Sequence, residues 1–177
     1  PIVIFSPARR VRDNTTKHTL ENVMEVPEVV INIVTFDMVH QVSLASCEYL
    51  KGENEFVKAG FIEKPATIVK PPMVKESKVQ LECKVIEIKP LGTEGGAGNL
   101  VICEVLRMHI DDSLLDENKK IDQRKINHVA RMGGDWYCKV EETNLFIVPK
   151  RDTELGIGVD ALPEAIINSK VLTGNNL

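Results

Sequence analysis

The stretch from residue 6 to residue 19, SPARRVRDNTTKHT, gathers the side chains best suited to bind an anion. It contains four cations and one acid: Arg9, Arg10, Arg12, Lys17 and Asp13. A helix-start pattern follows. The first N–H groups of a helix lack partners within the helix, and the helix dipole adds positive potential there. Arginine forks add bidentate donors. The stretch therefore predicts a phosphate site, and the alternative is a solvated basic loop ahead of a capped helix.

Histidine is the next residue type with chemistry to offer, and the four histidines are scattered without a HExxH or G-x-S-x-G pattern. His18 lies at the expected helix start, where a protonated ring would assist an anion but would oppose the helix dipole. His109 ends a strand-like run and is the candidate for catalysis, because a neutral imidazole can donate a hydrogen bond to a ligand such as a carboxamide. The alternative for His109 is an edge residue whose ring is already hydrogen-bonded.

The four cysteines are far apart in the sequence and form no C-x-x-C pair, so we expect no metal site. Cys83 and Cys103 lie in apolar, strand-like runs, where a free thiol behaves as a small buried hydrophobe. Cys47 lies in a polar stretch and is the thiol whose reactivity merits a test.

Three glycine-containing stretches are interpreted as turns. GIGVDA (156–161) matches the G-x-G-x-x-A dinucleotide pattern, but the 16 residues that follow it are too few for the rest of a βαβ unit. TEGGAGN (93–99) separates two strand-like runs and lacks the lysine of a phosphate loop. ARMGGDWY (130–137) fits a sharp turn that aims Arg131, and a catalytic role for Arg131 is the equal alternative.

Hydrophobic periodicity places the elements that must position these residues. We expect a strand before the basic stretch, then a short helix that is capped by Thr15 or Thr16 and ends at Pro27, and later a polar excursion at 48–60. The other expected elements are strands at 29–34, 78–91, 99–110, 135–140 and 144–149, helices at 37–46 and 162–172, and a helix-compatible segment at 111–129.

The pattern inside the strands indicates how they pack. The run 29–34 is apolar enough to be buried on both faces, or nearly so. The run 78–91 alternates as an antiparallel strand with one solvated face, and its register slips near Val85 as at a bulge. Because strands dominate the centre and two helices precede it, we predict a mainly β fold with flanking helices (α+β), an antiparallel barrel with the helices outside.

Composition limits the class of protein. The chain has 177 residues, 43% hydrophobic and 27% charged, which suits one globular domain with a substantial core. No apolar run approaches the roughly 20 residues of a spanning helix. No export signal is visible either, so we expect a cytoplasmic protein without membrane association. A net charge of −4 and only 5% aromatic residues argue against nucleic acid as a partner.

Three stretches taken together, PIVIFSPARR…DNTTKHTLENV, EVVINIV and ARMGGDWY, resemble the flavin reductase-like family, whose fold is the FMN-binding split barrel. In that family a strand leads into a serine-containing loop, a Lys-Asp-Thr-like helix start and a Glu-Phe-Val-Val-Asn-like strand. The matching residues here are Ser6, Lys17-His18-Thr19 and Glu28-Val29-Val30-Ile31-Asn32, with His18 where the family usually carries aspartate. The resemblance implies a split-barrel domain at 1–148 and a C-terminal extension at 149–177 that packs on the barrel or on a dimer partner.

The resemblance also implies a function. It implies a homodimer that binds FMN near the subunit interface, with NADH or NADPH passing a hydride to the flavin and a monooxygenase partner receiving the reduced flavin. The phosphate contacts carried over from the family are Ser6, Arg9, Arg10, Lys17, His18 and Thr19. Family members carry a further strand and a Ser/Phe-rich loop ahead of the part that matches PIVIF, so we expect a segment to precede residue 1. The alternatives are an FMN-binding protein without turnover and a purely structural dimer.

Overall fold

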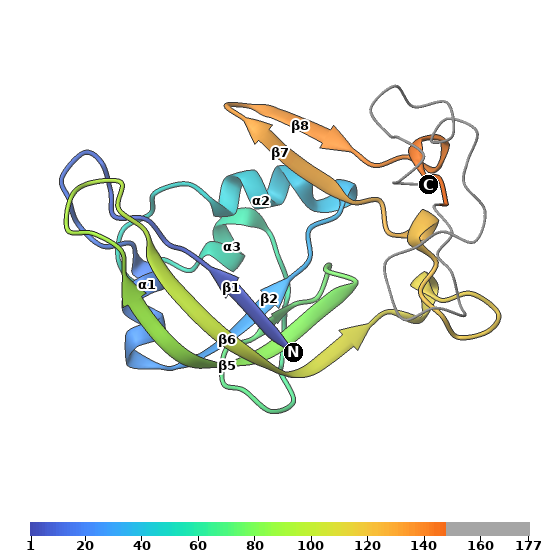
Figure 1. Ribbon diagram of the computed structural model, residues 1–177, viewed down its shortest axis with the longest axis horizontal. Coiled ribbons are helices and arrows are strands. Elements are labelled where there is room, and N and C mark those ends of the chain that lie inside the picture. The colour runs from blue at the N-terminus through green and yellow to red at the C-terminus, as the bar shows by residue number, and fades with distance from the viewer. Residues whose placement is uncertain (148–177) are drawn as a thin grey trace, which may run out of the picture. The chain divides into compact units, whose positions relative to one another are not determined.

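A long antiparallel hairpin of β5 (Val79–Pro90) and β6 (Asn99–Ile110) forms the centre of the main sheet in the computed structural model, which describes residues 1–147 (Figure 1). β1 (Ile2–Phe5) pairs with β6, and β2 (Glu28–Asn32) pairs with β5. The strand order is therefore β1-β6-β5-β2, and every pair is antiparallel. The strands are rich in valine and isoleucine, which suit a pleated backbone. The prediction of a mainly β chain with a few helices is confirmed.

The main sheet is open along both edges. Within residues 1–147, β1 and β2 each pair with one strand only, so the described strands do not close into a barrel. All five residues of β2 are half-buried. The expectation that 29–34 is buried on both faces is therefore wrong for this strand, because an edge strand leaves part of its surface to solvent.

The core lies on one face of this sheet, where α1 (His18–Glu25) packs. Its buried cluster consists of aliphatic and thiol side chains from α1, β5 and β6: Val23, Leu81, Cys83, Val85, Val101 and Cys103. Cys83 and Cys103 have no exposed surface, which confirms that they act as small hydrophobes. Burial, with a smaller effect from Cys103, raises the pKa of the Cys83 thiol to about 11.

Strand β5 departs from simple alternation at two points. Its pairing with β6 shifts register between Glu82 and Cys83 and again between Val85 and Glu87, which confirms the bulge expected near Val85. The expected solvated face is wrong for the first part of the strand, because Gln80 is 3% exposed and Glu82 is fully buried. Backbone N–H groups of residues 67–69 bond to Glu82, so the preceding loop covers this face.

Helix α1 begins one residue later than the expected threonine caps allow. Its N-cap position is Lys17, which makes no side-chain capping hydrogen bond. Thr16 instead donates its hydroxyl to Glu21 at 2.9 Å, and Thr15 bonds to Asp13. The capping residue was therefore predicted wrongly, although the helix itself is confirmed.

Two further helices lie between β2 and β5. The expected helix at 37–46 is confirmed as a 3-10 turn, η1 (Phe36–Met38), that continues into α2 (Val39–Ala45). The polar excursion at 48–60 contains an element that the sequence did not suggest, the short helix α3 (Glu55–Ala59), which is capped by Asn54. Cys47 precedes it and is exposed.

Two small hairpins complete the first part of the fold. β3 (Glu63–Lys64) pairs with β4 (Met73–Val74), and β7 (Val129–Gly133) pairs with β8 (Trp136–Lys139). β8 confirms the strand expected at 135–140.

The helix-compatible segment at 111–129 forms no α-helix. It contains two 3-10 turns, η2 (Asp112–Leu114) and η3 (Gln123–Lys125). Asp111 and Asp122 each accept a hydrogen bond from the N–H two residues ahead, at 2.9 and 3.1 Å. Aspartate side chains thus satisfy the local backbone in a turn and compete with a continuing helix.

The chain divides into two compact units, Pro1–Val140 and Glu141–Leu177. The second unit shows one 3-10 turn among its described residues, η4 (Glu142–Asn144), and residues 145–147 are not a strand as expected for 144–149. The predicted helix at 162–172 and the GIGVDA stretch lie outside the described residues, and the division at residue 148 stays a prediction. Within residues 1–147 no helix is long and apolar enough to cross a membrane.

Candidate functional site

The basic stretch after β1 is a loop that its own arginines hold together. The Arg9 backbone N–H donates to Ala97 O at 2.8 Å. Its guanidinium donates to Asn14 Oδ1 at 2.6 Å and also to the Asn14 carbonyl. Asn14 has a left-handed backbone with φ of 56° and donates its amide to Thr93 O at 2.9 Å. Arg9 therefore shapes the loop and docks it on the β5–β6 turn, as the adjacent blue and green loops in Figure 1 show.

The guanidinium of Arg10 is also bound to other residues of the protein. Its Nη1 donates to Thr15 Oγ1 at 3.1 Å and to the Thr16 carbonyl, and its Nε lies 3.4 Å from a carboxylate oxygen of Glu48. The Arg10 side chain is only 15% exposed. The structure thus places the donors of both predicted phosphate-binding arginines inside the loop.

The other four predicted residues keep free donors. The hydroxyls of Ser6 and Thr19 and the ammonium group of Lys17 are exposed and make no hydrogen bond to another described residue. The backbone N–H groups of His18 and Thr19 are likewise unpaired within residues 1–147, since the first bond of α1 comes from Leu20. The missing side-chain cap at Lys17 therefore leaves the helix start open to a ligand.

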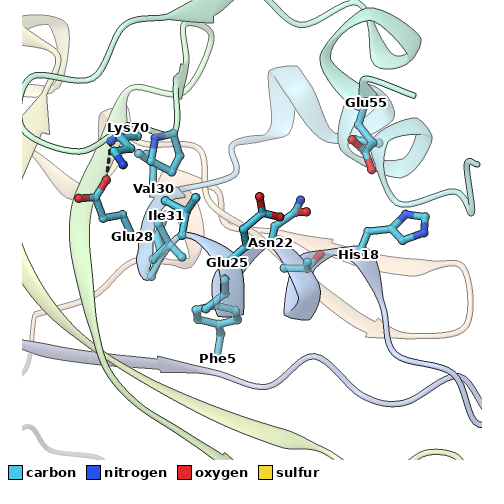
Figure 2. A pocket seen from close by; sticks show the side chains of 15 residues that line it. Phe5, His18, Asn22, Glu25, Glu28, Val30, Ile31, Glu55 and Lys70 are labelled. Carbon is cyan, nitrogen blue, oxygen red and sulfur yellow. Dashed lines mark hydrogen bonds between the residues drawn. The ribbon is translucent and has the colours of Figure 1, made fainter. Parts of the chain in front are cut away.

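His18 and Thr19 line a groove of about 750 Å³, which we call the α1 groove. Phe5, directly before Ser6, lines it too, together with the apolar side chains of residues 29–31 of β2. Figure 2 shows His18 and Glu55 at one end of the groove and Glu28 and Lys70 at the other.

Charge varies along the α1 groove. Three carboxylates, Glu25, Glu28 and Glu55, face a single lysine, Lys70, whose backbone N–H donates to Glu28 Oε2 at 2.7 Å. The groove as a whole is therefore acidic and unsuited to phosphate along its length. The end at the α1 start, where the unpaired N–H groups lie, is the part that suits an anion.

The buried carboxylate of Glu82 is a polar centre that sequence reasoning missed. It accepts backbone N–H bonds from Thr67, Ile68 and Val69 at 3.0, 2.6 and 3.0 Å, and it lies 2.5 Å from His109 Nε2. Burial by itself raises the pKa of Glu82, but the bonds from His109 and the three N–H groups outweigh it and lower that pKa to about 2. Glu82 is therefore ionised, and the proton on Nε2 is assigned to His109.

Glu82 and Glu28 together hold the segment 67–70, whose last residue, Lys70, lines the α1 groove. They accept four consecutive backbone N–H groups, those of residues 67–69 and of Lys70. One sequence feature could have indicated this role of Glu82, namely a glutamate inside an apolar strand. The alternating pattern of the strand instead predicted that this side chain faces solvent.

His109 ends β6 as expected, but it does not join the six predicted phosphate residues. It lies at the end of the hairpin opposite the turn that contacts Arg9 (Figure 1). Its ring is already hydrogen-bonded to Glu82, which is the structural alternative stated above. A catalytic role for His109 stays a prediction.

The turn at ARMGGDWY is confirmed. Gly133 and Gly134 adopt left-handed backbone with φ of 107° and 53°, and the Arg131 guanidinium donates to Gly134 O at 3.0 and 3.2 Å. Arg131 also lines a second groove, of about 400 Å³, between α2 and the β7–β8 hairpin.

The chain is similar in sequence and in fold to known proteins. The flavin reductase like domain family matches residues 1–126. An uncharacterized protein of Aquifex aeolicus is 32% identical over 139 residues, which are 78% of this chain and 68% of that protein. Nitrilotriacetate monooxygenase component B from Bacillus cereus has a similar structure with a TM-score of 0.73 and 25% identity, covering 80% of this chain and 70% of its own. A Shewanella frigidimarina protein assigned as a flavin reductase with a split barrel domain has a TM-score of 0.70 and 28% identity, covering 85% and 71%.

Proposed function

The chain belongs to the flavin reductase like domain family, and on that premise we propose that it binds FMN and reduces it with NADH or NADPH. The matched residues, 1–126, include β1, the basic loop, α1 and the whole β5–β6 hairpin. The observation that carries the proposal is the uncapped start of α1, with Lys17 at its N-cap and two unpaired N–H groups behind it. A helix start of this kind suits a phosphate group.

The residues present fit the FMN phosphate, with one revision of the predicted set. Ser6, Lys17, His18 and Thr19 offer hydroxyl, ammonium, imidazole and N–H donors that no other described residue uses. A dianion accepts such donors strongly, because charge-assisted hydrogen bonds are about twice as strong as neutral ones. In this proposal Arg9 and Arg10 act indirectly, by holding the loop that carries Ser6 to the α1 start.

FMN supplies the two-electron chemistry when it is bound, and the chain binds and orients it. The apolar stretch of the α1 groove, from Phe5 to the β2 side chains, is suited to pack against an aromatic ring system. Glu25 and Glu28, further along the groove from His18, would repel the phosphate, which favours one orientation of the ligand.

The wider assembly belongs to the same proposal. We propose a cytoplasmic homodimer with a split-barrel domain at residues 1–148, an extension at 149–177, and the flavin near the subunit interface. Similarity to a monooxygenase component B supports transfer of reduced flavin to a monooxygenase partner. The presence of a split barrel domain in the Shewanella frigidimarina relative supports barrel closure in the full assembly.

The test is a titration of the protein with FMN, followed by addition of NADH or NADPH without oxygen. We expect flavin fluorescence to be quenched on binding and the visible flavin absorbance to bleach with at least one nucleotide. Binding without bleaching would leave the flavin-binding protein without turnover as the function. No binding with FMN in excess would overturn the proposal.

A matched pair of lysine variants locates the phosphate. We expect Lys17→Ala to weaken FMN binding about tenfold, which corresponds to about 1.4 kcal/mol. Lys120→Ala removes the same charge from an exposed position between η2 and η3, beyond the end of β6 opposite the β5–β6 turn, and should leave the affinity unchanged.

A further inference from the structure

A third cavity, separate from the α1 groove and from the groove at Arg131, lies where β5 begins and β6 ends. Its volume is about 440 Å³, and we call it the lysine cavity. The charged and titratable side chains that line it are Lys64, Lys75, Lys78, His109, Asp111 and Asp112. We propose that the lysine cavity binds the phosphate group of a small molecule, at a site separate from the basic loop and independent of the flavin.

Three separate segments bring the lysines together. Lys64 lies on β3 opposite Met73 of β4. Lys75 follows β4, and its backbone N–H donates to Ile62 O at 2.9 Å. Lys78 precedes β5, and its carbonyl accepts the Asp111 N–H at 2.9 Å. Backbone bonds therefore fix the positions from which the three ammonium groups reach the cavity.

The ammonium groups of these lysines are not held in salt bridges within residues 1–147. None of the three makes an ion pair or side-chain hydrogen bond with another residue in the range 1–147. Asp111 lines the cavity, but its carboxylate accepts the Ser113 N–H at 2.9 Å. That bond holds the pKa of Asp111 below its usual range, and Lys78 and Lys64 add a smaller effect. Three cations thus face two carboxylates, one of which already caps a turn.

His109 presents a ring of fixed orientation to the cavity. Its Nε2 is bound to Glu82 at 2.5 Å, so the ring is fixed in orientation, and its side chain is 23% exposed. Nδ1 makes no hydrogen bond to any of the described residues. A protonated ring can therefore donate Nδ1–H to an anion, while Glu82, fully buried, balances the ring's charge.

The neutral polar groups of the cavity are already used. The Ser77 hydroxyl bonds to the carbonyls of Ile33 and Val79, and the Gln80 amide bonds to the Val74 and Ser77 carbonyls. Recognition is therefore left to three flexible ammonium groups and one imidazole. Point-charge donors converging from several sides suit a group with several equivalent oxygens, which favours phosphate over a single carboxylate.

The lysine cavity is remote from the proposed flavin phosphate site. The basic loop docks on the turn between β5 and β6, whereas His109 is ten residues beyond the start of β6. An extended strand of that length spans roughly 30 Å. Occupancy of one site can thus be measured without the other.

The test uses inorganic phosphate as the probe and isothermal titration calorimetry with the full chain, against chloride at the same ionic strength. We expect saturable phosphate binding that weakens at least tenfold in Lys75→Ala/Lys78→Ala. Lys75→Arg/Lys78→Arg keeps the charge and should keep most of the affinity. Both lysines are exposed or half-buried, so neither pair of substitutions disturbs the core.

Lys17→Ala weakens the proposed phosphate site at the start of α1, so the phosphate binding that remains in this variant reports the lysine cavity. The proposal is overturned if phosphate binds no better than chloride, or if the alanine pair retains wild-type affinity. It is also overturned if Lys17→Ala alone abolishes binding, since that result places phosphate at α1.

Competition identifies the source of the phosphate. If NADPH displaces phosphate from the Lys17→Ala variant and NADH does not, the cavity accepts the phosphate monoester of a nucleotide. If neither nucleotide competes, the cavity binds free phosphate. Both results support the site, and neither depends on flavin reduction.

Discussion

Glu82 of β5 and His109 of β6 meet diagonally across the central hairpin, with 2.5 Å between Oε1 and Nε2. Glu82 pairs in register with Arg107, and His109 pairs with Gln80, so the two side chains share one face of the sheet. The same carboxylate holds three backbone N–H groups of residues 67–69. One buried charge therefore holds both the segment that precedes Lys70 and the ring of His109, which lines the lysine cavity.

Replacement of Glu82 by glutamine should destabilise the fold strongly. A carboxamide offers one acceptor oxygen and an amino group that cannot accept, so backbone N–H groups of 67–69 lose their partner. Breaking a buried charged network costs about 3 kcal/mol. Urea unfolding measures the loss, and Glu87→Gln, on an exposed position of the same strand, should stay within about 0.5 kcal/mol of wild type. Equal stability of Glu82→Gln and wild type would contradict this role.

Acid should destabilise the protein through the same carboxylate. The folded state holds the pKa of Glu82 at about 2, below its ordinary value of 4.5. The unfolded chain therefore binds this proton first, and the stabilising contribution, complete above about pH 5, is lost as pH falls from 4.5 toward 2. The free energy of unfolding, measured at several pH values across this range, should fall more steeply with decreasing pH for wild type than for Glu82→Gln. Parallel curves would show that Glu82 contributes nothing to the acid transition.

Removal of the Arg9 side chain should lower the stability of the fold, because this side chain holds the basic loop together. Its guanidinium donates to the Asn14 side chain and carbonyl, and loss of these bonds costs about 1–2 kcal/mol. Arg12 is the matched control, because its side chain is 71% exposed and bonds only to surface carboxylates. We expect Arg12→Ala to leave the urea midpoint unchanged. A midpoint lowered equally by both variants would argue against a specific role for Arg9.

Substitution of Gly98 by alanine should disturb Ser6 selectively. A Cβ at Gly98 would lie 2.6 Å from Ser6 Oγ, so the hydroxyl must rotate away. Because only this small group has to move, we expect a stability loss within about 1 kcal/mol. If Ser6 contacts the FMN phosphate as proposed, Gly98→Ala should weaken FMN binding several-fold. In a Ser6→Ala background the same change should have little further effect on affinity, and an undiminished effect would point away from Ser6.

The elements that depend on local pattern could be predicted from the sequence. Alternating aliphatic residues identified β5 and β6, and the glycine-rich 93–99 stretch marked their connection. The bulge near Val85 was visible as a slip in that alternation. These features are set by residues close in sequence, which is why periodicity reveals them.

Long-range pairing could not be predicted in the same way. Glu82 belongs to the interior because a loop 13 to 15 residues earlier covers its face and donates to it. Arg9 bonds to Asn14, whose left-handed backbone no sequence pattern indicated, and its predicted contact with a phosphate stays a prediction. The segment at 111–129 has helix-compatible composition, but its aspartates close short turns. In each case a tertiary or local polar bond overrides the propensity of the residues.

The pairing of β1 with β6 also imposes an order on events during synthesis. Val3 pairs with Cys103, so the basic loop cannot dock until the ribosome has released more than a hundred residues. The β5–β6 hairpin, by contrast, closes through a short connection and can form as soon as β6 emerges. In the nascent chain β1 therefore stays unpaired until β6 has been synthesised. The proposed cofactor-binding site forms only after that point in translation.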